Sequence, residues 1–381
     1  MTQAQQLQQI LRAVSSVDAL HLERARAHHL RLTKPAGSLG RLEDLGAQLC
    51  AIAARTPPPL LHRPAIAVFA GDHGVLAEGV TSWPAEVTAQ MVGNFCAGGA
   101  AINVLANHIG ARLVVVDVGV ASPLTHLHHH PDFRSRNIRY GTDNLAQGPA
   151  MTPEEALTAV LVGAAIAGEL VDEGADLLVG GDMGIGNTTA SAALIAAATG
   201  ADALTVTGRG TGIDDAMLAR KQAAVAAGLS RWRQQHATTD VDADPMAVLA
   251  MLAELGGLEI AALAGFFLGG AARKVPVVLD GVIALAAACC AAALCPPAVG
   301  YFIAGHRSSE PAATVALRSL ALEPLLDLQL RLGEGSGAAL AVPLIRAAAA
   351  VMHEMATFDA ADIDGSEIDG STNDGETEAV Q

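Results

Sequence analysis

Five short apolar runs divide the chain, and each of them ends in small or polar residues. The runs occupy residues 65–70, 113–116, 176–179, 275–279 and 298–304. Their length and unbroken apolar character predict strands that are buried on both faces. Stretches of helix length separate them, so we expect an α/β fold with a Rossmann-like parallel sheet flanked by helices.

The two ends of the chain differ from this alternating pattern. Apolar residues recur at helical spacing in the first 55 residues, and the proline-rich segment 56–59 ends that section. We expect 1–58 and 332–358 to form a smaller helical domain and 59–331 to form the larger α/β domain. Residues 359–381 hold eight acidic residues and no Lys or Arg, which predicts a disordered acidic tail.

Polar and glycine-rich segments follow the predicted strands. Examples are Gly71-Asp72-His73-Gly74 after the first run and residues 305–310 after the last. The carboxyl ends of parallel strands share one edge of a sheet, and ligands bind at that edge. The pattern therefore favours an enzyme that acts on a small molecule.

The segment 180–189, GGDMGIGNTT, joins a predicted strand to a predicted helix. Such a glycine-rich turn aims backbone N–H groups and a helix dipole at an anion, usually a phosphate. Asn187, Thr188 and Thr189 are residue types that cap helix N-termini. The segment matches neither the GxGxxG fingerprint nor a P-loop. The alternative is a tight turn whose glycines serve packing alone.

Four other segments hold candidate chemistry. A second glycine-rich turn, 207–215, precedes a helix with Lys221, which suits phosphate binding or a solvated surface. Glu334 lies between glycines and is either a general base or a solvated carboxylate. Ser82 and Gln90 flank a helix start and either contact a heteroaromatic ligand or serve as cap and surface. Asp72 and His73 form an acid–base or metal site or, as we favour, a structural turn.

Composition narrows the function classes. The formal net charge is −16, with half of it in the acidic tail, so neither a nucleic-acid groove nor a polybasic membrane patch is predicted. The uncharged run 281–295 is too short to span a membrane, and Pro296-Pro297 ends it. Five cysteines without CxxC spacing, and a polar N-terminus, fit a cytoplasmic protein. For the His-rich loop 126–130 we expect a solvated loop, and a metal site is the less favoured alternative.

Six motifs occur in a fixed order along residues 5–358. They are KPAGSLGRLE at 34–43, GDHGV at 71–75, GVTSWP at 79–84, DMGIGNTT at 182–189, GRGTG at 208–212 and GEGSG at 333–337. Together they resemble the nicotinate-nucleotide–dimethylbenzimidazole phosphoribosyltransferase family. The resemblance implies transfer of phosphoribose from nicotinate mononucleotide to 5,6-dimethylbenzimidazole, with inversion at C1′, for the lower ligand of cobalamin.

The resemblance also implies roles for individual residues. Glu334 corresponds to the family's general base, and Asp182 and Asp280 are candidates to stabilise positive charge on the ribose. Many family members have Glu at the position of Asp182. The predicted substrate-binding residues are Ser82, Gln90, Asp182, Met183, Gly184, Gly186, Asn187, Thr188, Gly208, Lys221, Asp280, Gly281, Ser308, Gly333 and Gly335.

The family resemblance carries expectations about partners as well. It implies a homodimer, no metal and no redox cofactor. Two other classes stay open from the sequence: a non-catalytic protein of the same fold that binds the nucleotide or the benzimidazole, and a membrane-embedded component of the same pathway. Glu334 disfavours the first, and interrupted apolar runs disfavour the second.

Overall fold

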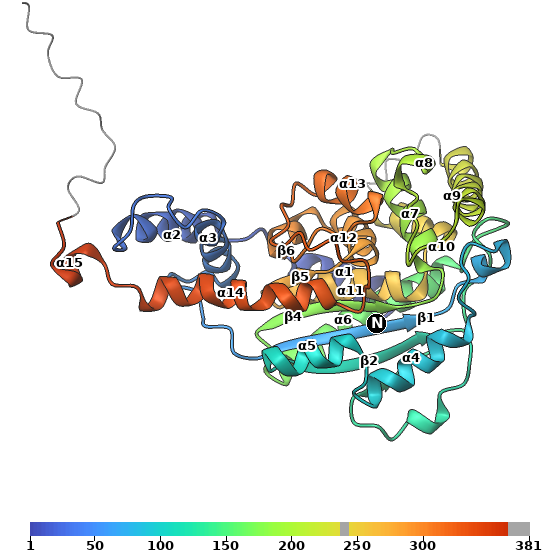
Figure 1. The fold of residues 1–381 in the computed structure, drawn as a ribbon, viewed down its shortest axis with the longest axis horizontal. Helices are drawn as coiled ribbons and strands as arrows, with labels where there is room; N and C mark the ends of the chain where they lie inside the picture. Colours follow the sequence, from blue (N-terminus) through green and yellow to red (C-terminus); the bar gives the residue numbers. More distant parts are fainter. Residues whose placement is uncertain (237–243, 365–381) are drawn as a thin grey trace, which may run out of the picture. The chain divides into compact units, whose positions relative to one another are not determined.

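One six-stranded sheet forms the core of the computed structural model, which describes residues 1–236 and 244–364 (Figure 1). Its strands are β1 (Pro64–Gly71), β2 (Arg112–Gly119), β3 (Phe133–Ser135), β4 (Leu177–Met183), β5 (Val277–Leu279) and β6 (Phe302–Ala304). Their order is β3-β2-β1-β4-β5-β6, and all neighbouring pairs are parallel. This is the strand order of the Rossmann fold, so the predicted fold class is confirmed.

Two strands differ from the sequence prediction. β3 was not predicted, because it is a three-residue edge strand in which only Phe133 is buried, so it leaves no apolar run. The last predicted strand, 298–304, is mostly the 3-10 helix η3 (Pro296–Tyr301), and only Phe302–Ala304 pairs with β5. Apolar residues are buried in both conformations, so hydrophobicity alone does not distinguish them.

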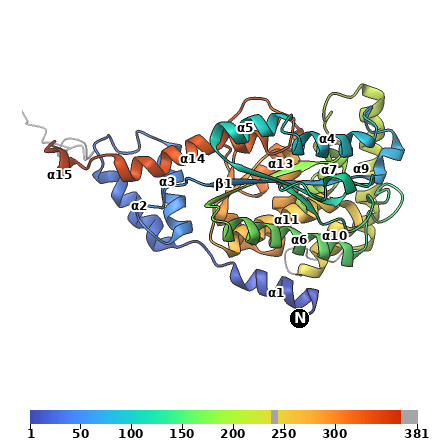
Figure 2. The same cartoon turned by 90° about the horizontal axis from the view of Figure 1, so that it is seen from below.

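Helices cover both faces of the sheet. Figure 2 shows α4 (Glu86–Cys96) and α5 (Ala101–Ile109) on one face, and α11 (Leu258–Ala272) with α6 (Pro153–Asp172) outside it on the other. The small residues of α6 and α11 allow close packing: a Cβ at Gly163 would overlap the Ala262 carbonyl. The remaining helices are α1 (Gln3–Ala13), α2 (Ala19–Arg31), α3 (Arg41–Ala53), η1 (Gly74–Glu78), η2 (Thr125–Leu127), α7 (Asn187–Thr199), α8 (Ala203–Val206), α9 (Asp215–Gln235), α10 (Pro245–Leu255), α12 (Val282–Leu294), α13 (Pro311–Ser319), α14 (Ser336–Glu354) and α15 (Phe358–Ala361).

The chain divides into two compact units at boundaries that differ from the expected ones. The larger unit comprises Met1–Val17 and Leu61–Pro343, and the smaller comprises Asp18–Leu60 and the chain from Leu344 onward. Residues 1–17 belong to the larger unit because Leu7 is buried and the Tyr301 hydroxyl donates to the Ser15 carbonyl at 3.1 Å. The smaller unit has its own buried cluster of Ala25, Ala47, Cys50 and Met352.

The chain after α14 forms a further short helix, and the most apolar helices are largely buried. Phe358–Ala361 forms a short helix capped by Thr357, so the tail predicted to be disordered is ordered at its start; residues 365–381 lie outside the described residues. Among the described helices, Ser336–Glu354 is the one that is long and apolar enough to cross a membrane, and 56% of it is buried inside the protein. The uncharged run 281–295 forms α12, and its residues, like those of the apolar helix α11, are buried almost throughout.

Candidate active site

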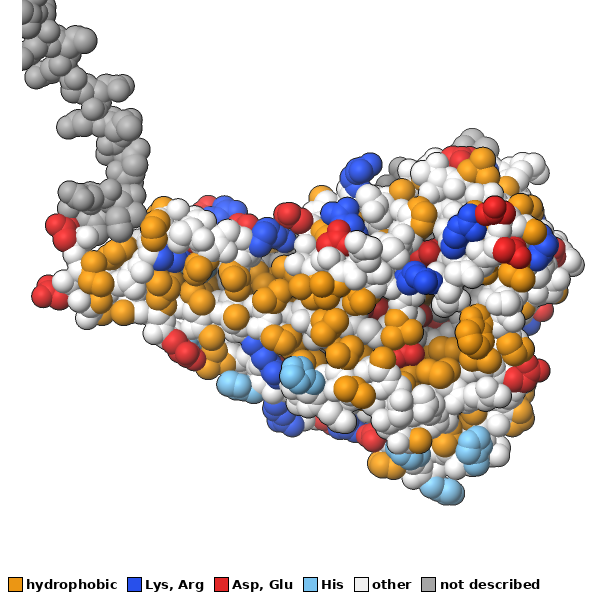
Figure 3. All heavy atoms as spheres, in the orientation of Figure 1, with side chains coloured by type: hydrophobic (Ala, Val, Ile, Leu, Met, Phe, Trp, Pro, Cys, Tyr) orange, Lys and Arg blue, Asp and Glu red, His pale blue; other side chains and the backbone are white. Residues whose placement is uncertain are grey.

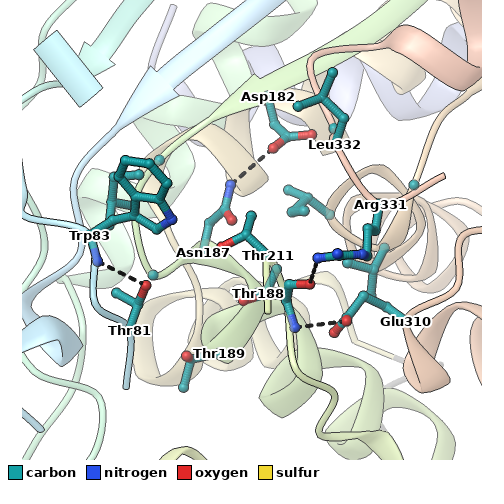
Figure 4. A pocket seen from close by; sticks show the side chains of 18 of the residues that line it. Thr81, Trp83, Asp182, Asn187, Thr188, Thr189, Thr211, Glu310, Arg331 and Leu332 are labelled. Carbon is teal, nitrogen blue, oxygen red and sulfur yellow. Dashed lines mark hydrogen bonds between the residues drawn. The ribbon is translucent and has the colours of Figure 1, made fainter. Parts of the chain in front are cut away.

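The site lies at the carboxyl ends of the strands, within the larger unit. β1 and β4 are neighbours at the point where the strand order reverses, which is where open α/β sheets bind ligands. A cavity of about 310 Å³ opens there (Figure 4). Its wall is built from five segments of the chain, namely 80–91, 182–189, 209–221, 281–283 and 306–334.

Most of the predicted site residues line this cavity. They are Asp182, Met183, Gly184, Gly186, Asn187, Thr188, Lys221, Gly281, Ser308, Gly333 and Glu334. The others lie just outside the wall: Ser82 and Gln90 are exposed beside the lining residues Trp83 and Met91, and Gly208, Asp280 and Gly335 each adjoin a lining residue. The tertiary structure therefore brings together segments that are far apart in the sequence.

The turn after β4 serves both packing and the cavity. A Cβ at Gly184 would overlap the Gly71 carbonyl at the end of β1, so this glycine is required for close packing. Gly186, at φ +94°, precedes α7 in the left-handed conformation. The residue types of Asn187, Thr188 and Thr189 predicted a helix cap, but these residues are the first three of helix α7. The Asn187 side chain instead donates to Asp182 Oδ2 at 3.0 Å.

Asp182 faces the cavity with an unsatisfied oxygen. Its Oδ1 is buried and has no hydrogen-bond partner in the described part of the chain. Burial, and then the negative charge of Asp280, raise the pKa of Asp182 well above its usual range. A buried carboxylate of this kind gains free energy when a positively charged group binds beside it.

Lys221 supplies a buried cation beside Thr188 of the same turn. Its Nζ donates to Thr188 Oγ1 at 2.9 Å and to the Gly208 carbonyl at 3.0 Å. Burial lowers the pKa of Lys221 to about 8, although Glu310 opposes the shift. The ammonium therefore stays charged at neutral pH and is poised for an anion. The alternative of a solvated surface lysine does not hold, because Lys221 is only 2% exposed.

The second glycine-rich turn is fixed around this lysine. Glu310 Oε1 accepts the Gly210 N–H at 2.8 Å, and Arg331 donates to the Gly210 carbonyl at 3.0 Å. A Cβ at Gly208 would overlap the Glu310 carboxylate, so close packing requires glycine there as well. Ser308 is buried nearby, and its hydroxyl accepts the Glu310 N–H at 3.4 Å.

Glu334 lies in a strained turn above the end of β4. Its φ is +65°, and those of Gly333 and Gly335 on either side are +84° and +88°. Glu334 Oε2 accepts the Ile102 N–H, at the start of α5, at 3.4 Å. Burial raises the pKa of Glu334, against the lowering effect of that hydrogen bond. A buried carboxylate with a raised pKa in a cavity suits a general base near neutral pH, whereas a solvated carboxylate would be exposed.

The Asp72 and His73 side chains contact other parts of the protein and do not line the cavity. Asp72 Oδ2 accepts the Ala121 N–H at 2.8 Å, as expected for a turn. His73 Nε2 lies 2.7 Å from Glu259 Oε1 of α11, and both side chains are buried. Burial lowers the pKa of His73, but the Glu259 carboxylate outweighs it and the net pKa is raised. In the residues that the structure describes, no cluster of His, Cys, Asp and Glu is suited to a metal, and His126, His128 and His129 are not buried.

Several cavity residues were not predicted from the sequence. Trp83 and the Arg331–Leu332 pair lie on opposite sides of the cavity in Figure 4, and Arg209 adds a second guanidinium to the wall. Trp83 lies in the motif GVTSWP and Arg209 lies in GRGTG, so their place in these motifs could have indicated them as cavity residues. Arg331 has no local signal, because only the fold brings its segment next to the turn at Gly210.

Comparison with known proteins agrees with this geometry. A family model described as "Phosphoribosyltransferase" matches residues 14–363. The chain belongs to this phosphoribosyltransferase family. It is an enzyme, because relatives that share about half of its residues over most of its length are named as phosphoribosyltransferases.

The phosphoribosyltransferase relatives are similar over nearly the whole chain. The nicotinate-nucleotide–dimethylbenzimidazole phosphoribosyltransferase of Salinispora tropica is 52% identical, covering 93% of this chain and 98% of that protein. The enzyme of the same name from Chloroflexus aurantiacus is 51% identical, covering 92% and 97%. The crystal structure of CobT from Thermus thermophilus has a TM-score of 0.85 at 47% identity, covering 91% of this chain and 99% of that one.

Proposed function

We propose that this phosphoribosyltransferase transfers phosphoribose from nicotinate mononucleotide to 5,6-dimethylbenzimidazole, giving α-ribazole 5′-phosphate and nicotinate. The single observation that carries the proposal is the buried Glu334 carboxylate at the wall of the cavity that the turns following β4 and α8 also line. The names of the relatives supply the substrates, and the cavity supplies the groups such a reaction needs.

The proposed mechanism assigns the proton to Glu334. One nitrogen of the benzimidazole attacks C1′ while the other nitrogen gives its proton to the Glu334 carboxylate. The bond between C1′ and the nicotinate nitrogen breaks, and its electron pair neutralises the pyridinium ring. The leaving group therefore needs no acid. Attack opposite the leaving group converts the β-linked donor to an α-linked product.

The proposed donor site has charges of the correct sign. Lys221, Arg209 and Arg331 offer cations for a phosphate and a nicotinate carboxylate. The unpartnered Asp182 oxygen offers a negative charge beside the position where the ribose becomes positive. Trp83 and Met183 offer flat and apolar surfaces on which an aromatic acceptor can lie.

The direct test is an assay of purified protein with both substrates, with Glu334→Gln beside the wild type. We expect α-ribazole phosphate from the wild type and a loss of about 10²-fold or more in the variant. Equal turnover in both proteins would show that the base is another group. No product from a folded wild-type protein would favour a relative of the family that binds these ligands without catalysis.

We propose further that the enzyme is a cytoplasmic homodimer. Apolar side chains gather on the face shown in Figure 3. Large apolar side chains of the larger unit, including Val104 at 65% exposed and Leu332 at 53%, are left in contact with water in a single copy. Sedimentation velocity gives the mass in solution, and a monomer at micromolar concentration would contradict this proposal.

A further inference from the structure

The sequence suggested that Asp280 acts on the substrate, but its contacts indicate a different role. Asp280 follows β5 and is 1% exposed. Its oxygens accept backbone N–H groups from the turn of Glu334: Oδ2 from Gly335 at 3.2 Å, and Oδ1 from Gly337 at 2.7 Å and Ala338 at 3.0 Å. These three bonds occupy the carboxylate, which therefore faces the turn rather than the cavity.

His306, which follows β6, completes this arrangement. Its Nε2 lies 3.3 Å from Asp280 Oδ1, and both side chains are buried. A Cβ at Gly337 would overlap the His306 imidazole, so the first turn of α14 rests directly on the ring. Burial lowers the pKa of His306, but the hydrogen bond to Asp280 outweighs it and raises the net pKa. The pair therefore anchors the first turn of α14 to the ends of β5 and β6.

The turn needs such a restraint because its conformation is unfavourable. Glu334 adopts a left-handed φ, which is unfavourable for a residue that carries a Cβ. From below, β4 contacts the turn so closely that a Cβ at Gly181 would overlap the Glu334 carbonyl. The turn is therefore held on one side by the backbone of β4 and on the other by the Asp280 carboxylate.

We propose that Asp280 and His306 are positioning residues that fix the direction of the Glu334 carboxylate, and that Asp280 does not stabilise the ribose directly. This inference rests on the proposed role of Glu334 as the base. A base that is displaced by about 1 Å loses about 10²-fold in rate. The loss falls on the chemical step, because Asp280 contacts the turn of Glu334 and does not line the cavity.

The test is a double-mutant cycle with Asp280→Asn, Glu334→Gln and the double variant. Asparagine keeps the size of the side chain but replaces one acceptor oxygen with an NH₂ group that opposes the Gly335 N–H. We expect kcat to fall by about 10–10²-fold in Asp280→Asn, with an unchanged KM for the donor. In the double variant we expect no loss beyond that of Glu334→Gln, because both changes disable the same base.

Asp176→Asn is the matched control. Asp176 also accepts backbone N–H groups, those of His62 and Arg63 at 2.7–3.0 Å, but it precedes β4 at the opposite end of the sheet. We expect this variant to keep the wild-type kcat. If the losses of Asp280→Asn and Glu334→Gln multiply in the double variant, Asp280 acts separately from the base and the inference is wrong.

Amide hydrogen exchange separates this inference from the proposed function. We expect Gly335, Gly337 and Ala338 to exchange faster in Asp280→Asn than in the wild type, whatever reaction the enzyme catalyses. Unchanged exchange would overturn the role of Asp280. Full turnover by Glu334→Gln would instead contradict the base itself, while the exchange rates would still report whether Asp280 holds the turn.

Discussion

Replacement of Lys221 by Met should separate stability from activity. The pKa of Lys221 is lowered from 10.5 to about 8 by burial. Keeping the ammonium charged at pH 7 therefore costs the folded protein about 3 kcal/mol, since one pKa unit is about 1.4 kcal/mol. Methionine removes that cost but leaves the Gly208 carbonyl without its donor, which costs about 1–3 kcal/mol. At pH 7 the variant should be as stable as the wild type, or up to about 2 kcal/mol more stable.

The pH dependence tests this reasoning more sharply than the value at pH 7. The lysine titrates near 10.5 in the unfolded chain and near 8 in the folded protein. Between these values the unfolded chain binds more protons, so the stability of the wild type rises with pH. From pH 7 to pH 9.5 the wild type should gain about 2 kcal/mol relative to Lys221→Met.

Urea unfolding at the two pH values measures this difference, and Lys274→Met is the control. Lys274 is exposed, so its replacement should leave the pH dependence unchanged. At pH 7 the kcat/KM for the donor should fall by about 10–10²-fold in Lys221→Met, the value of a hydrogen bond to a charged group. A stability difference between Lys221→Met and the wild type that does not vary with pH would refute the electrostatic argument, and an unchanged kcat/KM would refute the role in binding.

Three further predictions concern the same cavity. Gly181→Ala should lower kcat by at least about 10²-fold, because the new methyl group overlaps the Glu334 carbonyl and displaces the proposed base. Steady-state kinetics measure the loss, and circular dichroism like that of the wild type shows that the variant is folded. Normal turnover would contradict this prediction. The value of kcat/KM should fall on the acid side as Glu334 is protonated, at a pH above the usual carboxylate range because burial raises the pKa of Glu334. It should fall on the alkaline side near pH 8 as Lys221 loses its proton. Loss of the alkaline decline in Lys221→Met would identify that group, and persistence of the decline would assign it to another group. Asp182→Asn should raise the urea midpoint at neutral pH, because it removes a carboxyl group whose ionisation is opposed by burial and by Asp280. The same variant should lower kcat. A lower urea midpoint would show that the hydrogen bond from Asn187 to Asp182 outweighs the electrostatic cost.

The sequence by itself determined four of the six strands and the location of most functional segments. Apolar runs identified β1, β2, β4 and β5, since a strand buried on both faces must be apolar throughout. Glycine-rich segments after those runs marked the cavity wall, because parallel strands end at one edge. The motif order indicated the family and, through it, predicted that Glu334 and Lys221, which are more than a hundred residues apart, belong to one site.

The tertiary structure decided what each polar side chain contacts. Nothing local in the sequence distinguishes Asp182, which has an unpartnered oxygen at the cavity, from Asp280, whose oxygens bind the turn of Glu334. Both lie at the end of a buried strand, and the partners that set them apart come from segments brought together by the fold. Lys221 likewise became a buried cation only through the packing of α9 against the turn at Gly208. Burial and partner geometry, which set pKa and role, depend on contacts between distant segments and so are fixed by the fold rather than by local sequence.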